Sequence, residues 1–382
     1  AVGISTKNCA KTIENVVRVV DEGLKKYFPD KEGLIIVSDG FSTDKTRDIA
    51  EGIKTESEKI VKQQEGSLGK GNGVKTIFSL SKENQAEAIA LVDGDLTSIK
   101  PEWIKRLLLP VLEGNDLVVP FYLRDRYDGV ITNQIAFPLT KTLYGVNIRQ
   151  PIGGEYGLSS RYSQIALSHK LFPAKFGIDI FLTTVACCEG MKIVESVLGI
   201  KEHESTKEYE DPEKLLVPMF YQVVGRIFEL ISYYKEHIKK VRGMREIERI
   251  GVIPSVAPAR IPVDKEVLLT KFKAKYEEFI QGKKEAEFLE ELLPSFEKID
   301  KEKIENFSLP LDLWVKAVYY SINAFLKGEE VMNILRALWQ GRFIALVKET
   351  EKMDNQEAED YIQKQVDIFA KYKYLLRKSQ ES

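Results

Sequence analysis

The chain has 382 residues, and at roughly 150 residues per domain this length predicts about two or three domains. Hydrophobic residues make up 43% and charged residues 30%, a balance typical of a globular protein and not of a disordered chain. The 56 basic residues nearly cancel the 58 acidic ones, so the net charge gives no reason to expect nucleic acid or an anionic membrane as a partner.

Three cysteines are too few for a disulfide framework, and no apolar run is long enough to span a bilayer. The chain opens in a short apolar run, without the charged and then long apolar segments of a signal peptide. We therefore expect a cytoplasmic protein with no membrane partner.

The first half of the chain alternates short apolar runs with amphipathic segments. Apolar runs predict strands at 2–5, 34–37, 60–62, 88–92 and 117–122. Apolar residues at helical spacing predict helices at 11–27, 70–80 and 101–112, the last opening with Pro101 at a typical first helical position. This β-α-β-α order predicts an α/β fold, with a mostly parallel sheet and helices on both faces.

The second half changes character after about residue 211, where the patterns become long and helical. Residues 251–264 carry three prolines and are typical of a stiff connector. Helical periodicity returns at 311–326, 331–347 and 358–375. We predict an α/β domain over 1–210, a helical extension over 211–250, the connector over 251–264 and a C-terminal helical domain over 265–382.

The most informative motif ends the predicted strand at 88–92, where Asp93-Gly94-Asp95 places two carboxylates two residues apart. Ligands of open α/β sheets bind beyond the carboxyl ends of the strands, and extended backbone can aim both side chains the same way. Two close carboxylates repel each other unless a cation lies beside them, and a hard divalent ion fits this need. The alternative is a turn with two solvated aspartates.

A second motif, residues 66–73 (GSLGKGNG), surrounds Lys70 with glycines just before a predicted helix. Such a loop can bind an anion with its backbone amides and one mobile cation. Its spacing differs from that of a P-loop, and a flexible loop leading into a helix is the alternative.

Three further positions can bind ligands. Asp39 ends a strand where a nucleotide base or ribose could bind, although Ser42 and its neighbours also predict helix capping there. Glu155 follows paired glycines that allow close approach of a ligand, with a tight turn as the alternative. His203 is a candidate metal ligand, although a lone histidine is more often structural or exposed.

Taken together, residues 69–71 (GKG), 92–95 (VDGD), 150–155 (QPIGGE), 176–179 (FGID) and His203 occur in one order. That order resembles the retaining GT-A glycosyltransferases that make glycerate-based compatible solutes, which include mannosylglycerate, glucosylglycerate and glucosyl-3-phosphoglycerate synthases. The resemblance implies a GT-A fold over residues 1–210 and a divalent metal, Mg²⁺ or Mn²⁺. It also implies a donor such as GDP-mannose, GDP-glucose or UDP-glucose, a glycerate-type acceptor and a homo-oligomer.

Residue by residue, the resemblance implies the following roles. The metal ligands would be Asp95 and His203, and the catalytic residues Asp179, Lys70 and Asp93. The donor would be bound by Lys7, Asp39, Lys70, Asp93, Gly94 and Glu155. The acceptor would be bound by Arg124, Thr132, Gly153, Gly154 and Phe176.

Two departures from the family pattern bear on substrate choice. Cys9 stands where relatives usually carry an acidic residue, two positions after Lys7, so the nucleobase stays open. Residues 129–132 (GVIT) lack the arginine of the phosphoglycerate-using relatives, which favours free D-glycerate, although Arg124, Arg126 or Lys141 could bind a phosphate instead.

The main hypothesis is therefore a metal-dependent retaining glycosyltransferase that moves mannose or glucose to D-glycerate. The nearest alternative is glucosyl-3-phosphoglycerate synthesis. A sugar-nucleotide pyrophosphorylase is disfavoured because residues 5–8 (STKN) lack a glycine-rich loop with an arginine. A degenerate nucleotide-sugar binding protein is the alternative without catalysis.

Overall fold

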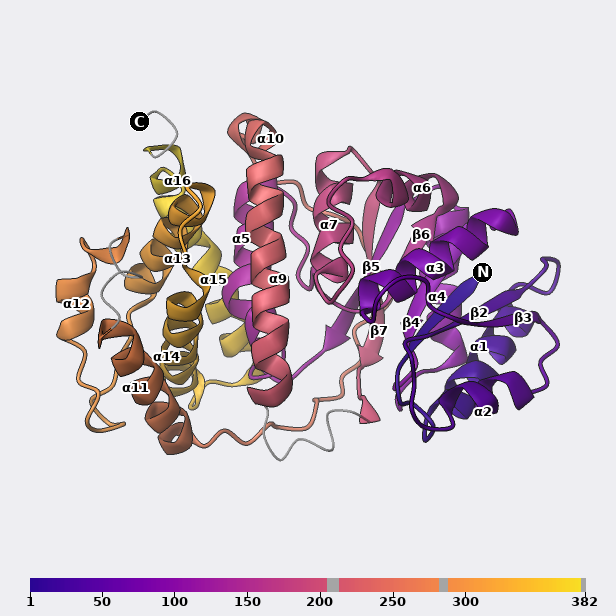
Figure 1. Cartoon of the computed structure of the whole chain (residues 1–382), viewed down its shortest axis with the longest axis horizontal. Helices are drawn as coiled ribbons and strands as arrows, with labels where there is room; N and C mark the ends of the chain where they lie inside the picture. The colour runs from indigo at the N-terminus through magenta and orange to yellow at the C-terminus, as the bar shows by residue number, and fades with distance from the viewer. Residues whose placement is uncertain (205–212, 282–287, 379–382) are drawn as a thin grey trace. The chain divides into compact units, whose positions relative to one another are not determined.

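The computed structural model describes residues 1–204, 213–281 and 288–378, and the chain divides into two compact units (Figure 1). Unit 1 comprises Ala1–Leu123, Val146–Leu230 and Arg245–Pro258, and unit 2 comprises Arg124–Gly145, Ile231–Met244 and Ala259–Ser382. The predicted boundary between residues 210 and 211 lies outside the described residues. None of the described helices is long and apolar enough to cross a membrane.

Unit 1 is built on an eight-stranded sheet with the order β3-β2-β1-β4-β6-β5-β7-β8. The strands are β1 (Val2–Thr6), β2 (Leu34–Asp39), β3 (Glu58–Gln63), β4 (Ala88–Asp93), β5 (Leu117–Leu123), β6 (Tyr156–Ser159), β7 (Ile193–Ile200) and β8 (Arg249–Ile250). All neighbours pair in parallel except β6, which runs antiparallel between β4 and β5. The predicted mostly parallel sheet is confirmed.

Helices cover both faces of this sheet. Successive side chains of β1 point to opposite faces and so contact different helices. Val2 and Ile4 join the buried core formed with α1 (Ile13–Tyr27) and α4 (Pro101–Leu112), which pack against each other. On the opposite face Gly3 leaves room for Ile77 of α3 (Lys70–Glu83), since a Cβ at Gly3 would lie 2.2 Å from Ile77 Cγ2.

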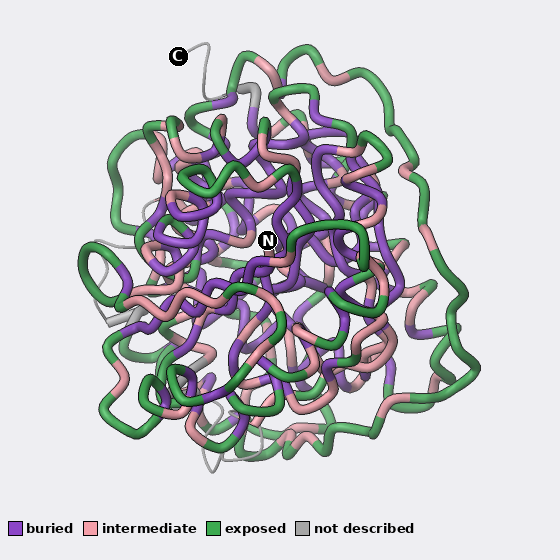
Figure 2. Tube along the Cα trace, turned by 90° about the vertical axis from the view of Figure 1, so that its right-hand side faces the viewer, coloured by how far each residue is buried: buried purple, intermediate pink, exposed green. Residues whose placement is uncertain are grey.

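The remaining helices of unit 1 complete these layers. They are α2 (Thr46–Gly52), α6 (Ser160–Ser168), α7 (Ile178–Cys188) and, as far as Leu230, α9 (Glu213–Tyr233). The α6 and α7 helices pack against α3 and against each other. Buried stretches, drawn purple, alternate with exposed green turns along the chain (Figure 2).

Unit 2 is helical in its described part, as expected for the C-terminal half. Its helices are η1 (Thr132–Ala136), α5 (Phe137–Tyr144), α10 (Lys235–Lys240), α11 (Lys265–Gln281), α12 (Leu293–Glu297), α13 (Leu311–Leu326), α14 (Met332–Thr350), α15 (Asn355–Tyr372) and α16 (Leu375–Lys378). Residues 251–264 contain no helix or strand. The segment 124–145, which follows β5 of unit 1 in sequence, folds with these C-terminal helices.

Candidate active site

The candidate site lies at the carboxyl ends of β1, β2 and β4, which finish at the same edge of the sheet. Ser5 of β1 is in register with Asp93 of β4, and Thr6 is in register with Asp39 of β2. The chain then turns tightly, and the Gly94 amide donates to the Ser5 carbonyl over 2.9 Å. Parallel strand order therefore brings together two aspartates that are 54 positions apart in sequence.

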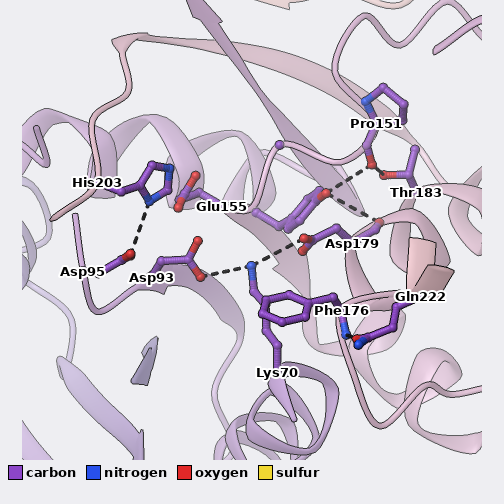
Figure 3. A network of polar contacts seen from close by, with 12 residues as sticks. Lys70, Asp93, Asp95, Pro151, Glu155, Phe176, Asp179, Thr183, His203 and Gln222 are labelled. Atoms are coloured by element: carbon purple, nitrogen blue, oxygen red, sulfur yellow. Dashed lines mark hydrogen bonds and ion pairs between the residues drawn. The ribbon is translucent and has the colours of Figure 1, made fainter. Parts of the chain in front are cut away.

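Lys70 begins α3 and points its ammonium group at two carboxylates (Figure 3). Its Nζ lies 3.0 Å from Asp93 Oδ1 and 3.4 Å from Asp179 Oδ2. Burial by itself would lower the pKa of Lys70, but Asp179 and Asp93 outweigh it and hold that pKa well above its usual value. Lys70 is therefore a fixed positive charge at this edge of the sheet.

The glycines beside Lys70 have a packing role. A Cβ at Gly69 would lie 2.2 Å from the Ala174 carbonyl oxygen, and a Cβ at Gly71 would lie 1.9 Å from that of Pro173. Both neighbours are rigid backbone atoms, so only glycine lets the start of α3 approach this loop. The Gly-Lys-Gly sequence thus fixes the place from which Lys70 extends.

Asp179 lies in the first turn of α7, where the helix dipole favours a carboxylate. Burial raises the pKa of Asp179, and Lys70 opposes this effect. For Asp93 the balance is reversed: burial alone would raise its pKa, but Lys70 and Lys201 hold it below its usual value. The two aspartates on Lys70 therefore differ in how readily each takes up a proton.

A second lysine, Lys201, lies just after β7 and pairs with Glu155. Lys201 Nζ is 2.6 Å from Glu155 Oε2 and 3.7 Å from Asp93 Oδ2, and it donates to the Gly153 carbonyl over 2.9 Å. The Tyr122 hydroxyl donates to the same Glu155 oxygen over 2.5 Å. The side chains of Lys201 and Glu155 are 4% and 0% exposed, so this ion pair is buried.

Burial also acts on the carboxyl group of Glu155. It raises the pKa of Glu155, and Lys201 opposes that effect. The other carboxylate oxygen, Oε1, has no hydrogen-bond partner among the described residues. Glu155 thus offers one saturated and one unsaturated acceptor.

Asp95 and His203 face each other across two paired loops (Figure 3). His203 Nδ1 lies 3.3 Å from Asp95 Oδ1, and Leu96 forms an antiparallel bridge with His203. The Glu204 amide donates to the Asp95 carbonyl over 2.9 Å, which fixes one loop on the other. Asp93, Asp95 and His203 each offer one ligand atom, and these atoms lie within 4.8 Å of one another.

These three groups fit a divalent metal ion. Two carboxylate oxygens and one imidazole nitrogen are suitable ligands for Mg²⁺ or Mn²⁺. The charge balance points the same way: Asp93, Glu155 and Asp179 share the two ammonium groups of Lys70 and Lys201, and Asp95 adds a fourth carboxylate beside His203. With all four ionised, the negative charge in excess is that which a divalent cation neutralises.

The predicted nucleotide contacts Lys7 and Asp39 lie beside these strand ends. Lys7 follows β1 and is exposed, and a Cβ at Gly40 would lie 3.5 Å from Lys7 Cβ. Asp39 is buried and accepts hydrogen bonds from the Ser42 amide and hydroxyl, over 3.0 and 2.5 Å. Burial raises the pKa of the Cys9 thiol to about 12, so Cys9 brings no negative charge to this region.

Three residues predicted to bind the acceptor belong to unit 1. A Cβ at Gly153 would lie 2.3 Å from Pro120 Cγ, so close packing requires glycine there. Gly154, with φ +101°, lies among the charged groups, because its Cβ would be 2.6 Å from Lys201 Nζ and 3.2 Å from Asp93 Oδ2. Phe176 is exposed, and its amide donates to Gln222 Oε1 over 3.0 Å.

The other two, Arg124 and Thr132, belong to unit 2 and converge on Gly129. A Cβ at Gly129 would lie 3.5 Å from both Arg124 Nη1 and Thr132 Oγ1. Gly129 has φ +70°, which favours glycine. The Arg124 guanidinium and the Thr132 hydroxyl therefore lie near each other. Arg124 Nη1 also lies 3.7 Å from Asp128 Oδ2, so an acceptor carboxylate would compete with Asp128 for it.

Nothing in the sequence motifs points to Lys201, Tyr122 or Thr12. The Thr12 hydroxyl donates to the Gly94 carbonyl over 2.7 Å and so supports the turn between the two aspartates. Lys201 stands two positions before His203, and that spacing at a strand end is the one signal in the sequence that could have indicated it. Tyr122 carries no such signal, since the pattern predicts only that it belongs to an apolar strand.

Comparison with known proteins finds a family model that matches part of the chain. Residues 1–166 match the family Glycosyl transferase family 2. Mannosylglycerate synthase from Rhodothermus marinus is 27% identical over 198 residues, which cover 48% of this chain and 49% of the relative. The chain thus spans about half the length of this curated relative.

Two solved structures of glucosyl-3-phosphoglycerate synthase from Mycobacterium tuberculosis are also similar. One is a complex with phosphoglyceric acid and the other a complex with Mg²⁺ and UDP. Each has a TM-score of 0.48 and 24% identity and covers 60% of this chain and 78% of that one. The family match over residues 1–166 spans β1 to β6 of the mostly parallel sheet.

Proposed function

We propose that this protein is a metal-dependent retaining glycosyltransferase that transfers mannose or glucose from a nucleotide sugar to D-glycerate. One observation carries the proposal: four carboxylates, two lysines and a histidine meet at the strand ends of a glycosyltransferase family 2 domain. The family supplies the reaction class. The glycerate acceptor is suggested by the similarity to mannosylglycerate synthase and by the motif order.

In this proposal Asp95 and His203 hold the divalent ion. Asp93 is close enough to be a third ligand, but both of its oxygens already face lysine ammonium groups. A bound Mg²⁺ or Mn²⁺ would neutralise charge on the diphosphate of the donor. We therefore assign Asp93 mainly to the donor itself, at its ribose or sugar hydroxyls.

Lys70 stabilises the leaving group. When the bond between the sugar and the diphosphate breaks, negative charge develops on the phosphate oxygens, and a fixed ammonium group beside them lowers the barrier. Asp93 and Asp179 hold the Lys70 ammonium in place before the donor binds. Such preorganisation is what makes electrostatic stabilisation effective.

We assign Glu155 and Asp179 to the sugar of the donor. The unsaturated Oε1 of Glu155 is a suitable acceptor for a hydroxyl of the donor hexose, while Lys201 and Tyr122 hold the other oxygen. Asp179 is an anionic partner for the oxocarbenium-like sugar or a base for the acceptor hydroxyl.

The acceptor carboxylate is assigned to Arg124 and Thr132. Free D-glycerate is favoured over 3-phosphoglycerate because residues 129–132 lack an arginine and because Arg126, another candidate phosphate ligand, is already occupied. Arg126 donates to the carbonyls of Thr350 and Met353, over 2.7 and 2.6 Å. The cytoplasmic location, the GDP or UDP base and the homo-oligomer stay predictions.

The test is acceptor-dependent nucleotide release by the full chain. GDP-mannose, GDP-glucose and UDP-glucose are each mixed with Mg²⁺ or Mn²⁺ and with D-glycerate, 3-phosphoglycerate or no acceptor. Release that requires D-glycerate, with a product of the mass of a hexosylglycerate, supports the proposal. Release only with 3-phosphoglycerate would show that the protein is a glucosyl-3-phosphoglycerate synthase. Nucleotide binding without release would show that it is a binding protein.

A further inference from the structure

The segment that carries Arg124 and Thr132 is held by the C-terminal helices of unit 2. We call residues 124–132 the acceptor segment. It follows β5 in sequence, yet Arg126 and Tyr127 donate hydrogen bonds within unit 2 to residues more than 200 positions later. A loop fixed in this way depends on distant helices for its conformation.

Arg126 is the centre of this attachment. Its Nη1 donates to the carbonyls of Thr350 and Met353 over 2.7 and 2.6 Å, and its Nη2 donates to Asn355 Oδ1 over 3.0 Å. These acceptors lie at the corner between α14, which ends at Thr350, and α15, which begins at Asn355. Carbonyls at a helix C-terminus carry partial negative charge, so a guanidinium is a suitable partner for the Thr350 carbonyl, which also accepts from the Met353 amide over 3.1 Å.

The corner that receives Arg126 is itself well defined. Asp354 caps α15: its side chain accepts from the Glu357 amide over 2.8 Å, and the Glu357 side chain accepts from the Asp354 amide over 2.8 Å. This reciprocal capping fixes the entry to the helix. Arg126 is therefore anchored to a rigid structure and not to a second mobile loop.

A short path leads from Arg126 to Thr132. The side-chain amide of Asn133 donates to the carbonyls of Arg126 and Asp128, over 3.2 and 3.3 Å. The backbone amide of Asn133 donates to the Gly129 carbonyl over 2.9 Å. Since Thr132 immediately precedes Asn133, a displacement of Arg126 changes the place where the Thr132 hydroxyl and the Arg124 guanidinium meet.

We propose that Arg126 is a positioning residue for the acceptor: through the α14–α15 corner it fixes the acceptor segment in the shape that binds the carboxylate. The inference rests on the proposed function, because it takes Arg124 and Thr132 as acceptor ligands. It gives the C-terminal helices a definite role, which is to set affinity for the acceptor and not for the donor. It also removes Arg126 from the candidates for a phosphate ligand, since its guanidinium already donates to three oxygen atoms.

The test compares Arg126→Met with Arg126→Lys and with a matched control, Lys348→Met. Lys348 also lies in unit 2 and also donates to three oxygens, the carbonyls of Ile304, Glu305 and Phe307, over 2.7, 2.9 and 2.6 Å. Its loss should lower the melting temperature to a similar extent without touching the acceptor segment.

In steady-state assays of the full chain, Arg126→Met should raise the KM for D-glycerate by about tenfold or more, since a displacement near 1 Å can reduce a rate by about 100-fold. The KM for the donor and kcat at saturating glycerate should stay within about twofold of wild type. Arg126→Lys should recover part of the affinity, because one ammonium can still reach the helix-end carbonyls. Lys348→Met should leave the KM for glycerate unchanged.

Three outcomes overturn the inference: an unchanged KM for glycerate in Arg126→Met, an equal rise in Lys348→Met, or a fall in kcat alone. Failure of the proposed function is recognised separately, because wild type would then release no nucleotide with any acceptor. In that case hydrogen exchange decides: faster exchange of amides 124–133 in Arg126→Met, and not in Lys348→Met, supports the positioning of the segment. Equal exchange in both variants refutes it.

Discussion

The two units each bury charged groups, but they balance them differently. In unit 2 the guanidinium of Arg342 is 0% exposed, and it meets Glu349 through Nη1 and Nη2, over 2.9 and 2.5 Å. The Tyr361 hydroxyl and the Leu309 carbonyl complete its surroundings, each at 2.9 Å. One cation is thus matched by one anion and by neutral partners within the unit.

In unit 1 three carboxylates, those of Asp93, Glu155 and Asp179, share the two lysines Lys70 and Lys201, and Asp95 faces His203. Burying unbalanced charge is unfavourable, and a protein retains it where a ligand completes the balance. The Arg342 network is closed within unit 2, whereas we propose that a metal ion and a substrate complete the strand-end cluster.

The largest effect should come from the proposed metal ligands. Asp95→Ala and His203→Ala should each lower metal-dependent turnover by about 10³-fold, near the upper end of what losing one electrostatic group does. Mn²⁺ should raise the melting temperature of wild type, because it binds only the folded state, and should not raise that of either variant. Differential scanning fluorimetry and the nucleotide-release assay measure both.

The control for these two variants is Asp48→Asn, which changes an exposed carboxylate on α2. It should keep both the turnover and the metal-induced shift. Near-normal turnover in Asp95→Ala or in His203→Ala would show that the assigned metal ligands are wrong.

Next in size is the contrast between the two buried cations. Lys201→Met should lower the free energy of unfolding by about 3–5 kcal/mol, because it leaves the buried Glu155 carboxylate without its partner. Arg342→Met should lower it by less, because the Glu349 side chain is 31% exposed and water can reach it. Only Lys201→Met should also lower kcat/KM per folded molecule, since Lys201 holds Glu155 and Gly153 at the site. Chemical denaturation measures the loss of stability, and kinetics corrected for the active fraction measure the loss of kcat/KM. Equal losses of kcat/KM in both variants would contradict the proposed difference between the two units.

A smaller effect distinguishes two glycines with nearly the same backbone. Gly154 has φ +101° and Gly114 has φ +102°, but a Cβ at Gly114 meets nothing within 4 Å, whereas one at Gly154 would lie 2.6 Å from Lys201 Nζ. Gly114→Ala should therefore show only the left-handed backbone penalty, about 1–2 kcal/mol. Gly154→Ala should show that penalty and also reduced turnover. If both variants keep full turnover, the charged cluster tolerates displacement of Lys201.

The smallest effect on turnover concerns two tyrosine hydroxyls. Tyr122→Phe removes the hydrogen bond to Glu155, and Tyr361→Phe removes hydrogen bonds to Arg342 and Glu349. Each should lower stability by about 1–3 kcal/mol, the range for a buried hydrogen bond to a charged group. We expect a modest fall in turnover for Tyr122→Phe alone, measured as kcat/KM for the donor; a similar fall for Tyr361→Phe would contradict the separation of roles.

The sequence predicts best those parts of the site that lie at the ends of regular elements. Asp93 follows an apolar strand and Lys70 opens an amphipathic helix, so local pattern and the geometry of parallel sheets suffice to bring them to one edge. The parallel pairing of β1 with β2 and with β4 was predictable for the same reason. In contrast, the antiparallel insertion of β6 between β4 and β5 carries no local signal.

The sequence predicts poorly what depends on pairing between distant segments. Lys201 looks like one of many surface lysines until Glu155 is found beside it. The acceptor segment lies in the first half of the chain, and nothing in its residues shows that Arg126 contacts the end of α14. Such contacts are set by tertiary packing, while local patterns report only which face of an element is apolar.

The most direct test of the central claim is acceptor-dependent nucleotide release by the full chain, measured after chelation of divalent ions and again after Mn²⁺ or Mg²⁺ is restored. We predict no release from the chelated protein, and release that returns with the metal only when a glycerate-type acceptor is present. Release that survives chelation, or that is indifferent to the acceptor, would contradict the proposed metal-dependent transfer.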